Sequence, residues 1–96
     1  MVEYRKGYFA RSKAGHDKGK IYIIIEETIT SGNGNGDFVM VADCETKTVE
    51  KPKKKRKKHL QIVLHGDEMI LEKLANEQEI RNTDIKQAIE NYINHE

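Results

Sequence analysis

Six consecutive cations occupy positions 53–58, and no other stretch of this chain suggests a chemistry so clearly. Like charges in such a run repel one another, so we expect all six side chains to stay in solvent. Against a nucleic-acid backbone they would neutralise phosphates and release the counterions held there. A solvated charged tract is the alternative, but the run lies between two predicted strands and a polyanion would offset its repulsion. The six cations are Lys53, Lys54, Lys55, Arg56, Lys57 and Lys58.

A second candidate site is the loop predicted between the first two strands, with the sequence KAGHDKGK at 13–20. Gly15 and Gly19 permit positive φ or a close backbone approach. The loop therefore has the means to present backbone amides and ammonium groups to phosphates. Spacing alone favours the plainer interpretation, an ordinary hairpin with solvated lysines. The cations of this loop are Lys13, Lys18 and Lys20.

Catalytic and metal-binding patterns are not found in the sequence. The glycine-rich stretch at 31–37 is not followed by the G-K-[ST] of a phosphate-binding loop, and Cys44 has no base beside it in sequence. We therefore predict no catalytic residue, no metal site and no cofactor, and we expect a protein that is not an enzyme. The four histidines, at positions 16, 59, 65 and 95, lack the tight spacing of metal ligands. We expect His59 to form a hydrogen bond with phosphate or backbone, or to have a structural role.

Length and composition bound the class of protein. The 96 residues suffice for one domain, or for one domain with a short appendage, and 34% of them are charged. The single cysteine excludes an intramolecular disulfide and fits a reducing cytosol, so we expect a cytoplasmic protein. The longest apolar run, 21–25, is too short to span a membrane, and the first residues lack the apolar region of a signal peptide.

The net charge of +1 conceals a segregation of charge along the chain. Residues 1–59 contain 14 Lys and Arg against 8 Asp and Glu, a balance of +6. Residues 60–96 contain 3 against 8, a balance of −5, and the two balances sum to +1. A basic body joined to an acidic end predicts a face that binds polyanions.

Five short strands and one or two helices are predicted to position these charges. Short runs between turn-forming residues indicate strands at 8–12, 20–30, 38–43, 47–50 and 59–64, and the β-branched, continuous run at 20–30 is the clearest of them. Five short strands hide their edges naturally in a small barrel. We expect Phe9 and Phe38 to be buried in its core, whereas Tyr4 and Tyr8 are open candidates for stacking on bases.

The residue pattern changes from strand-like to helix-like after Gly66. Asp67 or Glu68 is expected to begin a short helix, and Thr83 is expected to cap a second helix at 84–94. The apolar residues of the second helix recur with helical spacing: Ile85, Ala88, Ile89, Tyr92 and Ile93. The predicted fold is therefore α+β and mainly β, with a barrel at 1–65 and an acidic helical extension at 66–96.

Two separated motifs, GYFARSKAGHDKGK and VMVADCETKTVEKPKKKRKKHL, make residues 5–64 resemble the KOW-domain RNA-binding proteins. These include short bacterial stand-alone members and the fourteenth large-subunit ribosomal protein family of archaea and eukaryotes. The resemblance implies a five-stranded SH3-like barrel that binds RNA, often ribosomal RNA. Cys44 stands where the family usually has Gly, and Lys47 where Arg is common. The matching positions are Gly7, Ser12, Ala14, Gly15, Asp17, Lys18, Gly19, Asp43, Pro52, Lys53, Lys55, His59 and Leu60.

Together, the residues and the resemblance predict a ribosome-associated protein of translation that binds folded RNA, with ribosomal RNA and ribosomal proteins as expected partners. One alternative is a protein-interaction module whose acidic C-terminal helix docks a partner. PKKKRKK at 52–58 is also similar to a nuclear import signal. The predicted RNA-binding residues are Lys13, His16, Lys18, Lys20, Lys47, Lys53, Lys54, Lys55, Arg56, Lys57, Lys58 and His59.

Overall fold

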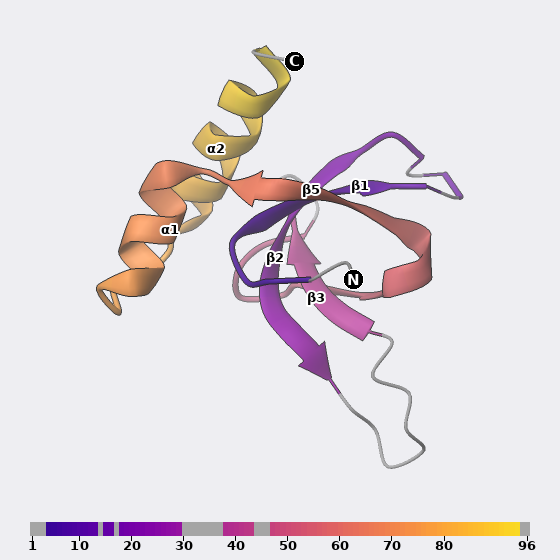
Figure 1. Cartoon of the computed structure of the whole chain (residues 1–96), viewed down its shortest axis with the longest axis horizontal. Helices are drawn as coiled ribbons and strands as arrows, with labels where there is room; N and C mark the ends of the chain where they lie inside the picture. Colours follow the sequence, from indigo (N-terminus) through magenta and orange to yellow (C-terminus); the bar gives the residue numbers. More distant parts are fainter. Residues whose placement is uncertain (1–3, 14, 17, 30–37, 44–46, 95–96) are drawn as a thin grey trace.

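The computed structural model describes residues 4–13, 15–16, 18–29, 38–43 and 47–94, with the backbone alone at 28, 29, 64 and 65. The chain forms five strands, a short 3₁₀ helix (η1) and two α-helices (Figure 1). The elements are β1 (Tyr8–Ser12), β2 (Ile21–Ile29), β3 (Phe38–Ala42), β4 (Lys53–Arg56), η1 (Lys57–His59), β5 (Leu60–Gly66), α1 (Glu68–Ala75) and α2 (Asn82–Asn94).

The five strands form one antiparallel sheet in the order β4-β3-β2-β1-β5. The sheet curls into a small SH3-like barrel, and both helices follow it in the chain (Figure 1). Ala10 in β1 lies opposite Tyr22 in β2 and Ile62 in β5, so β1 is paired along both edges. The predicted mainly-β barrel with a C-terminal helical extension is confirmed.

Residues 21–25 of β2 are apolar without interruption because both faces of this half of the strand are packed against other elements. Tyr22 and Ile24 point into the barrel, where they pack with residues of β1, β3 and β5. Ile21 and Ile23 point to the opposite face and join a second core with the helices. A single strand thus separates two cores.

The helices cover the outer face of the sheet and complete the second core. Ile70 of α1 and Ile85 of α2 are fully buried there with Phe9 of β1. The rings of Phe9 and Tyr92 stack with centroids 4.6 Å apart. The predicted apolar stripe of the second helix therefore packs on the barrel, and the segment after residue 65 shares a core with the segment before it.

Two predicted boundaries are wrong. Residues 47–50 are not a strand; the fourth strand lies inside the basic run, where Val41 to Phe38 of β3 pair with Lys53 to Arg56. Charged residues suit this position because β4 is an edge strand with one side towards solvent.

Helix α2 begins at Asn82, so Thr83 is not its cap. The Asp84 carboxylate instead accepts a hydrogen bond of 2.9 Å from the backbone N–H of Arg81, which satisfies a donor at the first turn. The predicted start of α1 is confirmed, since the Asp67 side chain caps it by accepting from Ile70 N at 3.2 Å.

Candidate nucleic-acid interface

The basic run is divided by the alternation of β4. Successive side chains of a strand point to opposite faces, so every second residue turns inward. Lys54 and Arg56 are exposed, whereas Lys55 between them is only 8% exposed. The expectation that all six cations stay in solvent is therefore wrong at Lys55.

Lys55 is accommodated by polar and aromatic neighbours inside the barrel. Its Nζ donates a hydrogen bond of 3.0 Å to the Oγ of Ser12, which is itself buried. The same ammonium lies 5.1 Å from the centroid of the Tyr22 ring, within cation–π range. A buried ammonium needs such partners, because leaving water without them is costly. Lys55 consequently stabilises the join between β4 and the start of the 13–20 loop.

The outward cations of β4 lie against an aromatic ring. Lys54 Nζ is 4.4 Å and the Arg56 guanidinium carbon 5.2 Å from the centroid of the Phe38 ring. Phe38 is half-buried and belongs to neither core, so the prediction of core burial is wrong for it. The reason is the alternation of side chains along a strand. Val39 and Val41 point into the barrel, so Phe38 points to the outer face.

The 13–20 loop is fastened beside η1 by backbone hydrogen bonds. Lys13 N donates to the carbonyl of His59 at 2.8 Å, and Gly19 N donates to the carbonyl of Ser12 at 2.8 Å. Gly15 and Gly19 have φ values of +77° and +90°, which confirms the predicted positive φ. The bond from Lys13 to His59 brings together two parts of the chain that lie 46 residues apart in sequence, and the bond from Gly19 to Ser12 closes the loop.

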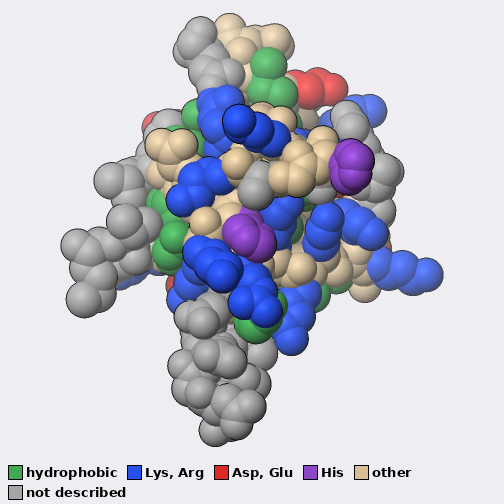
Figure 2. All heavy atoms as spheres, turned by 90° about the vertical axis from the view of Figure 1, so that its right-hand side faces the viewer, with side chains coloured by type: hydrophobic (Ala, Val, Ile, Leu, Met, Phe, Trp, Pro, Cys, Tyr) green, Lys and Arg blue, Asp and Glu red, His purple; other side chains and the backbone are tan. Residues whose placement is uncertain are grey.

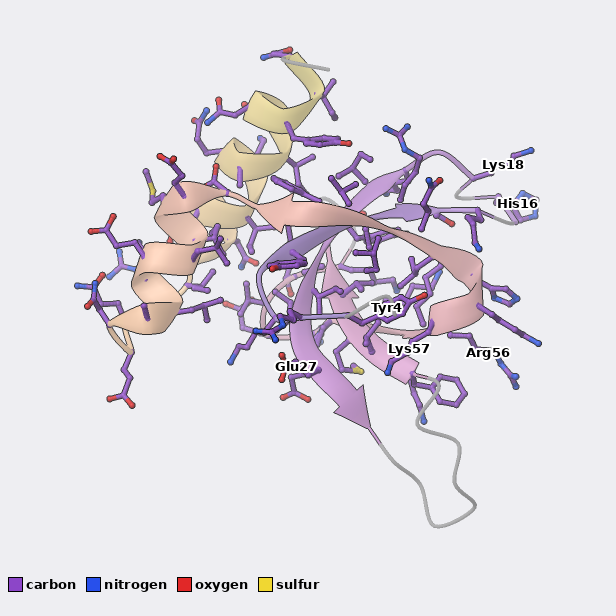
Figure 3. The ribbon with its side chains drawn as sticks, in the orientation of Figure 1. Tyr4, His16, Lys18, Glu27, Arg56 and Lys57 are labelled. Atoms are coloured by element: carbon purple, nitrogen blue, oxygen red, sulfur yellow. The ribbon has the colours of Figure 1, made fainter. Side chains whose placement is uncertain are left out.

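A groove with a volume of about 620 Å³ lies where the loop, β4 and η1 meet. Figure 2 shows this side of the molecule, on which Lys and Arg side chains gather around histidine. Figure 3 shows His16, Lys18 and Arg56 pointing out from the barrel on the same side. We call this hollow the basic groove. It is lined by Gly15, His16, Phe38, Lys53, Lys54, Lys55, Arg56 and His59.

The remaining predicted cations fall into two groups. Lys13, Lys18 and Lys58 are exposed, and each lies on the loop or on η1, the elements that border the basic groove. Lys20 and Lys47 are instead held at Asp43, which is 4% exposed. Lys20 Nζ lies 2.5 Å from Asp43 Oδ2, and the backbone N–H of Lys47 donates to Asp43 Oδ1 at 2.9 Å. These two residues brace the barrel rather than line the groove.

Tyr4 and Lys57 hold the N-terminal segment against η1. The Tyr4 hydroxyl donates to the Lys57 carbonyl at 3.1 Å, and the Lys57 ammonium lies 5.2 Å from the Tyr4 ring centroid. Partial burial raises the pKa of the Tyr4 hydroxyl above its ordinary value. Tyr4 also packs on the inner core, so its ring has a structural role.

Phe38 and Asp43 are the two residues of this region that sequence reasoning left out of the predicted site. The sequence did contain a signal for Phe38. All five residues of FVMVA are apolar, and successive side chains of a strand point to opposite faces, so some of them had to lie outside the barrel. Asp43 is one of the positions that match the KOW motif, but its role depends on the folded position of Lys20.

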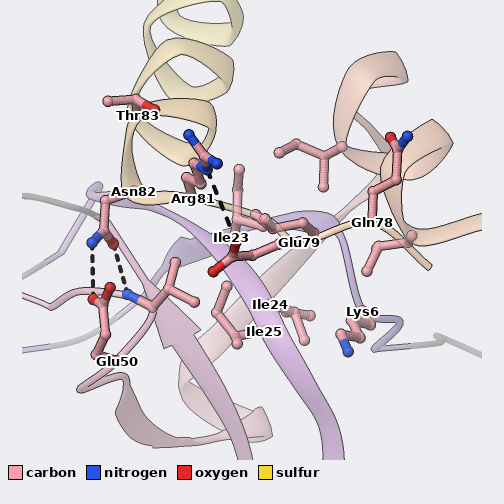
Figure 4. A pocket seen from close by; sticks show the side chains of 14 residues that line it. Lys6, Ile23, Ile24, Ile25, Glu50, Gln78, Glu79, Arg81, Asn82 and Thr83 are labelled. Atoms are coloured by element: carbon pink, nitrogen blue, oxygen red, sulfur yellow. Dashed lines mark hydrogen bonds and ion pairs between the residues drawn. The ribbon is translucent and has the colours of Figure 1, made fainter. Parts of the chain in front are cut away.

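A second hollow of about 890 Å³ lies between the barrel and the helices (Figure 4). Its floor is apolar, with Ile23 and Ile70 among its residues, and its rim is polar. Asn82 closes one end: its Oδ1 accepts from Val49 N at 2.8 Å and its Nδ2 donates to Glu50 at 2.9 Å. The bond from Asn82 is the main cause that lowers the pKa of the Glu50 carboxyl. This hollow is a junction that ties the 47–52 segment to α2.

Other kinds of site find no support within the described residues. No three His, Cys, Asp or Glu side chains of the described chain lie close enough together to hold a metal ion. None of the helices described is long and apolar enough to cross a membrane. Cys44, which stands where the KOW family usually has Gly, lies outside the described residues. No protein-family model matches this chain, and no curated protein matches it. The functional argument therefore stands on the basic groove and on the sequence motifs.

Proposed function

We propose that this protein binds folded RNA in the basic groove, as a KOW-type protein that works in the cytoplasm at the ribosome, on ribosomal RNA and beside ribosomal proteins. The observation that carries the proposal is that residues of both sequence motifs line the same groove. The loop that contains His16 and the strand that contains Lys54 and Arg56 line one groove.

The electrostatics of the groove suit a polyanion. No carboxylate is among the described residues that line it, and four of those residues are Lys or Arg. Ammonium and guanidinium groups on phosphates would supply the affinity, and the shape of the RNA would supply the selectivity. The resemblance to KOW proteins supports the same function, because Gly15 of the first motif and Lys53, Lys55 and His59 of the second line this groove.

The architecture weighs against the protein-docking alternative. A basic partner would need only the acidic residues of α2, whereas docking of an apolar partner surface would need the apolar face of α2 to be available. Ile85, Ala88 and Ile89 are instead buried against the barrel. The acidic residues left on the outside of α2, such as Glu90, are poor neighbours for RNA phosphates, so we expect the helices to be an accessory in RNA binding.

The test replaces three exposed cations of β4 and η1 together: Lys54→Gln, Arg56→Gln and Lys58→Gln. If about five phosphates are engaged, log K against log salt should have a slope near −4 to −5 for the unaltered protein, and each lost contact should reduce its magnitude by roughly 0.7–0.9. The melting temperature should stay level or rise, because the substitutions relieve repulsion. The loss of affinity should be similar across RNA sequences.

A matched control removes the same charge elsewhere. Lys6, Arg81 and Lys86 are also exposed and lie outside the basic groove. Their replacement by Gln should leave affinity nearly unchanged. Equal losses from both triple variants would indicate generic charge attraction, and no binding of RNA by the unaltered protein at low salt would defeat the proposal. Full affinity in a folded groove variant would favour the protein-docking alternative.

A further inference from the structure

Phe38 is an aromatic residue in an unusual place. It lies on the outer face of the barrel, half-buried, in the wall of a groove whose other side chains are all basic or histidine. A large apolar ring is expected in a core, so its presence on a charged surface indicates a specific role. The other described aromatic residues lie outside the groove lining: Tyr4, Tyr8, Phe9, Tyr22 and Tyr92.

Two cations lie over the Phe38 ring, but their attraction to the ring does not account for the groove in front of it. Lys54 and Arg56 lie within 4.4 and 5.2 Å of the ring centroid, so cation–π attraction holds them near it. The groove itself has a volume of about 620 Å³ and extends from Phe38 to His16 and His59 on the loop and η1. That volume is within the range of sites that hold a small organic group, about 300–1,000 Å³.

We infer that the basic groove holds an unpaired nucleotide of the RNA, with its base against the Phe38 ring and its phosphates on Lys54 and Arg56. The inference rests on the proposed function and names the part of the RNA that the groove takes. Every base has a π-face, so an aromatic ring stacks on any unpaired base, and an arginine plane serves beside it in the same way.

Paired RNA does not match this combination of groups. In a duplex the base faces are covered by their neighbours, and the major groove is too deep and narrow for side chains to reach the bases. A surface that needed only duplex phosphates would use the cations alone. The ring, the two cations and the volume of the open groove together fit a nucleotide from a loop, a bulge or a single strand. The imidazoles of His16 and His59 offer donors and acceptors to the edge of such a base.

The first experiment compares two RNAs of equal phosphate number, a hairpin with an unpaired loop and a blunt duplex, on the full chain. Phe38→Leu keeps an apolar side chain and removes the ring. It should weaken binding of the hairpin by about 5- to 150-fold, the range measured for a lost base–aromatic stack, and should change binding of the duplex by less than about twofold. Tyr8→Leu, at an aromatic position outside the groove, is the matched control and should not discriminate between the RNAs.

The second experiment uses the absence of tryptophan from the chain. Phe38→Trp introduces the only tryptophan of the chain at the position in question. Stacking on a base should quench its emission when the looped hairpin is added, and the duplex should produce no quenching at equal occupancy.

The outcomes separate this inference from the proposed function. Equal weakening of both RNAs by Phe38→Leu, or unquenched tryptophan at saturating hairpin, would overturn the unpaired nucleotide and leave RNA binding by the groove intact. Absence of binding to either RNA by the unaltered protein, or unchanged affinity in the Lys54, Arg56 and Lys58 variant, would overturn the proposed function itself. Selective loss on the hairpin together with quenching would support both.

Discussion

The 13–20 loop and η1, which form part of the basic groove, lie on the opposite side of the barrel from α1 and α2 (Figure 1). The two regions place their side chains in opposite ways. The helices turn isoleucines towards the sheet, where Ile70 and Ile85 are fully buried. The 13–20 loop and β4 instead keep cations such as Lys18 and Arg56 in solvent. Burial of apolar surface is the main stabilising contribution in folding, whereas exposed charge contributes little. The comparison teaches that stability should be concentrated on the helical side and binding on the groove side.

Strand β4 repeats this contrast within four residues. Lys55 is buried and bonded to Ser12, whereas its neighbours Lys54 and Arg56 are exposed beside Phe38. Residues of the same charge, adjacent in sequence, are therefore expected to differ in role. Substitutions on each side of the molecule, and within β4, can break or sharpen this division.

The largest effect is expected in the core beneath the helices. Ile85→Ala should reduce the free energy of unfolding by about 2–5 kcal/mol, because it opens a cavity at a fully buried position. The affinity of the remaining folded protein for RNA should be unchanged. Denaturant unfolding followed by titration with RNA at low temperature measures both quantities.

The control for Ile85 is Ile93 on the same helix, which is 51% exposed. Ile93→Ala should change stability by less than about 0.5 kcal/mol. A similar loss at both positions would contradict the packing of α2, and a loss of RNA affinity in folded Ile85→Ala protein would break the separation of stability from binding.

A smaller effect is expected at the buried lysine. Lys55→Ala removes the donor to Ser12 Oγ and the packing of the lysine stem, so it should cost about 1–3 kcal/mol of stability. Lys54→Ala on the exposed side should cost less than about 0.5 kcal/mol but should weaken RNA binding. If Lys55→Ala were fully stable and weakened binding as Lys54→Ala does, the inward placement of Lys55 would be wrong.

The smallest effect is expected where the two helices meet. Asp84 accepts from Lys73 Nζ at 2.8 Å and from Arg81 N at 2.9 Å, which joins α1 to the first turn of α2. Asp84→Asn weakens both bonds and should cost about 0.5–1.5 kcal/mol at pH 7. RNA affinity should not change, since none of these residues lines the basic groove.

The same aspartate predicts a pH dependence. The hydrogen bond from Lys73, and next the one from Arg81 N, hold the pKa of Asp84 below its ordinary value of 3.8. A lowered pKa in the folded state contributes stability that is present above pH 3.8 and is lost as the pH falls through the folded-state value. The stability difference between the unaltered protein and Asp84→Asn should therefore shrink steadily below pH 4. A difference that is constant down to pH 2 would show that the carboxylate charge contributes nothing.

Local pattern was enough to predict most of the fold. The β-branched run of β2, the glycines of the 13–20 loop and the apolar spacing from Ile85 to Tyr92 each impose one kind of element, because alternation and helical periodicity are properties of neighbouring residues. The Asp67 cap was readable for the same reason. The fourth strand was misplaced because a run of cations has low strand propensity, and only pairing with β3 makes it a strand.

The two-sided burial of β2 had a consequence that the sequence did not reveal. A division into a barrel at 1–65 and an extension at 66–96 follows the change of composition, but Phe9, Ile21 and Ile23 share their core with both helices. Removing the helices would expose these three side chains, so the barrel is expected to depend on them for stability.

The sequence by itself determined that this chain is a small mainly-β protein with its cations gathered in two motifs, because charge and hydrophobic periodicity are written in residue order. Tertiary structure decided which of those cations face outward. The alternation of side chains along β4 placed Lys55 inside the barrel, and the ion pair with Asp43 fixed Lys20. The hydrogen bond from Lys13 N to the His59 carbonyl placed the loop beside β4 and η1. Each of these depends on contacts between residues more than ten positions apart, and such contacts exist only once the sheet has formed.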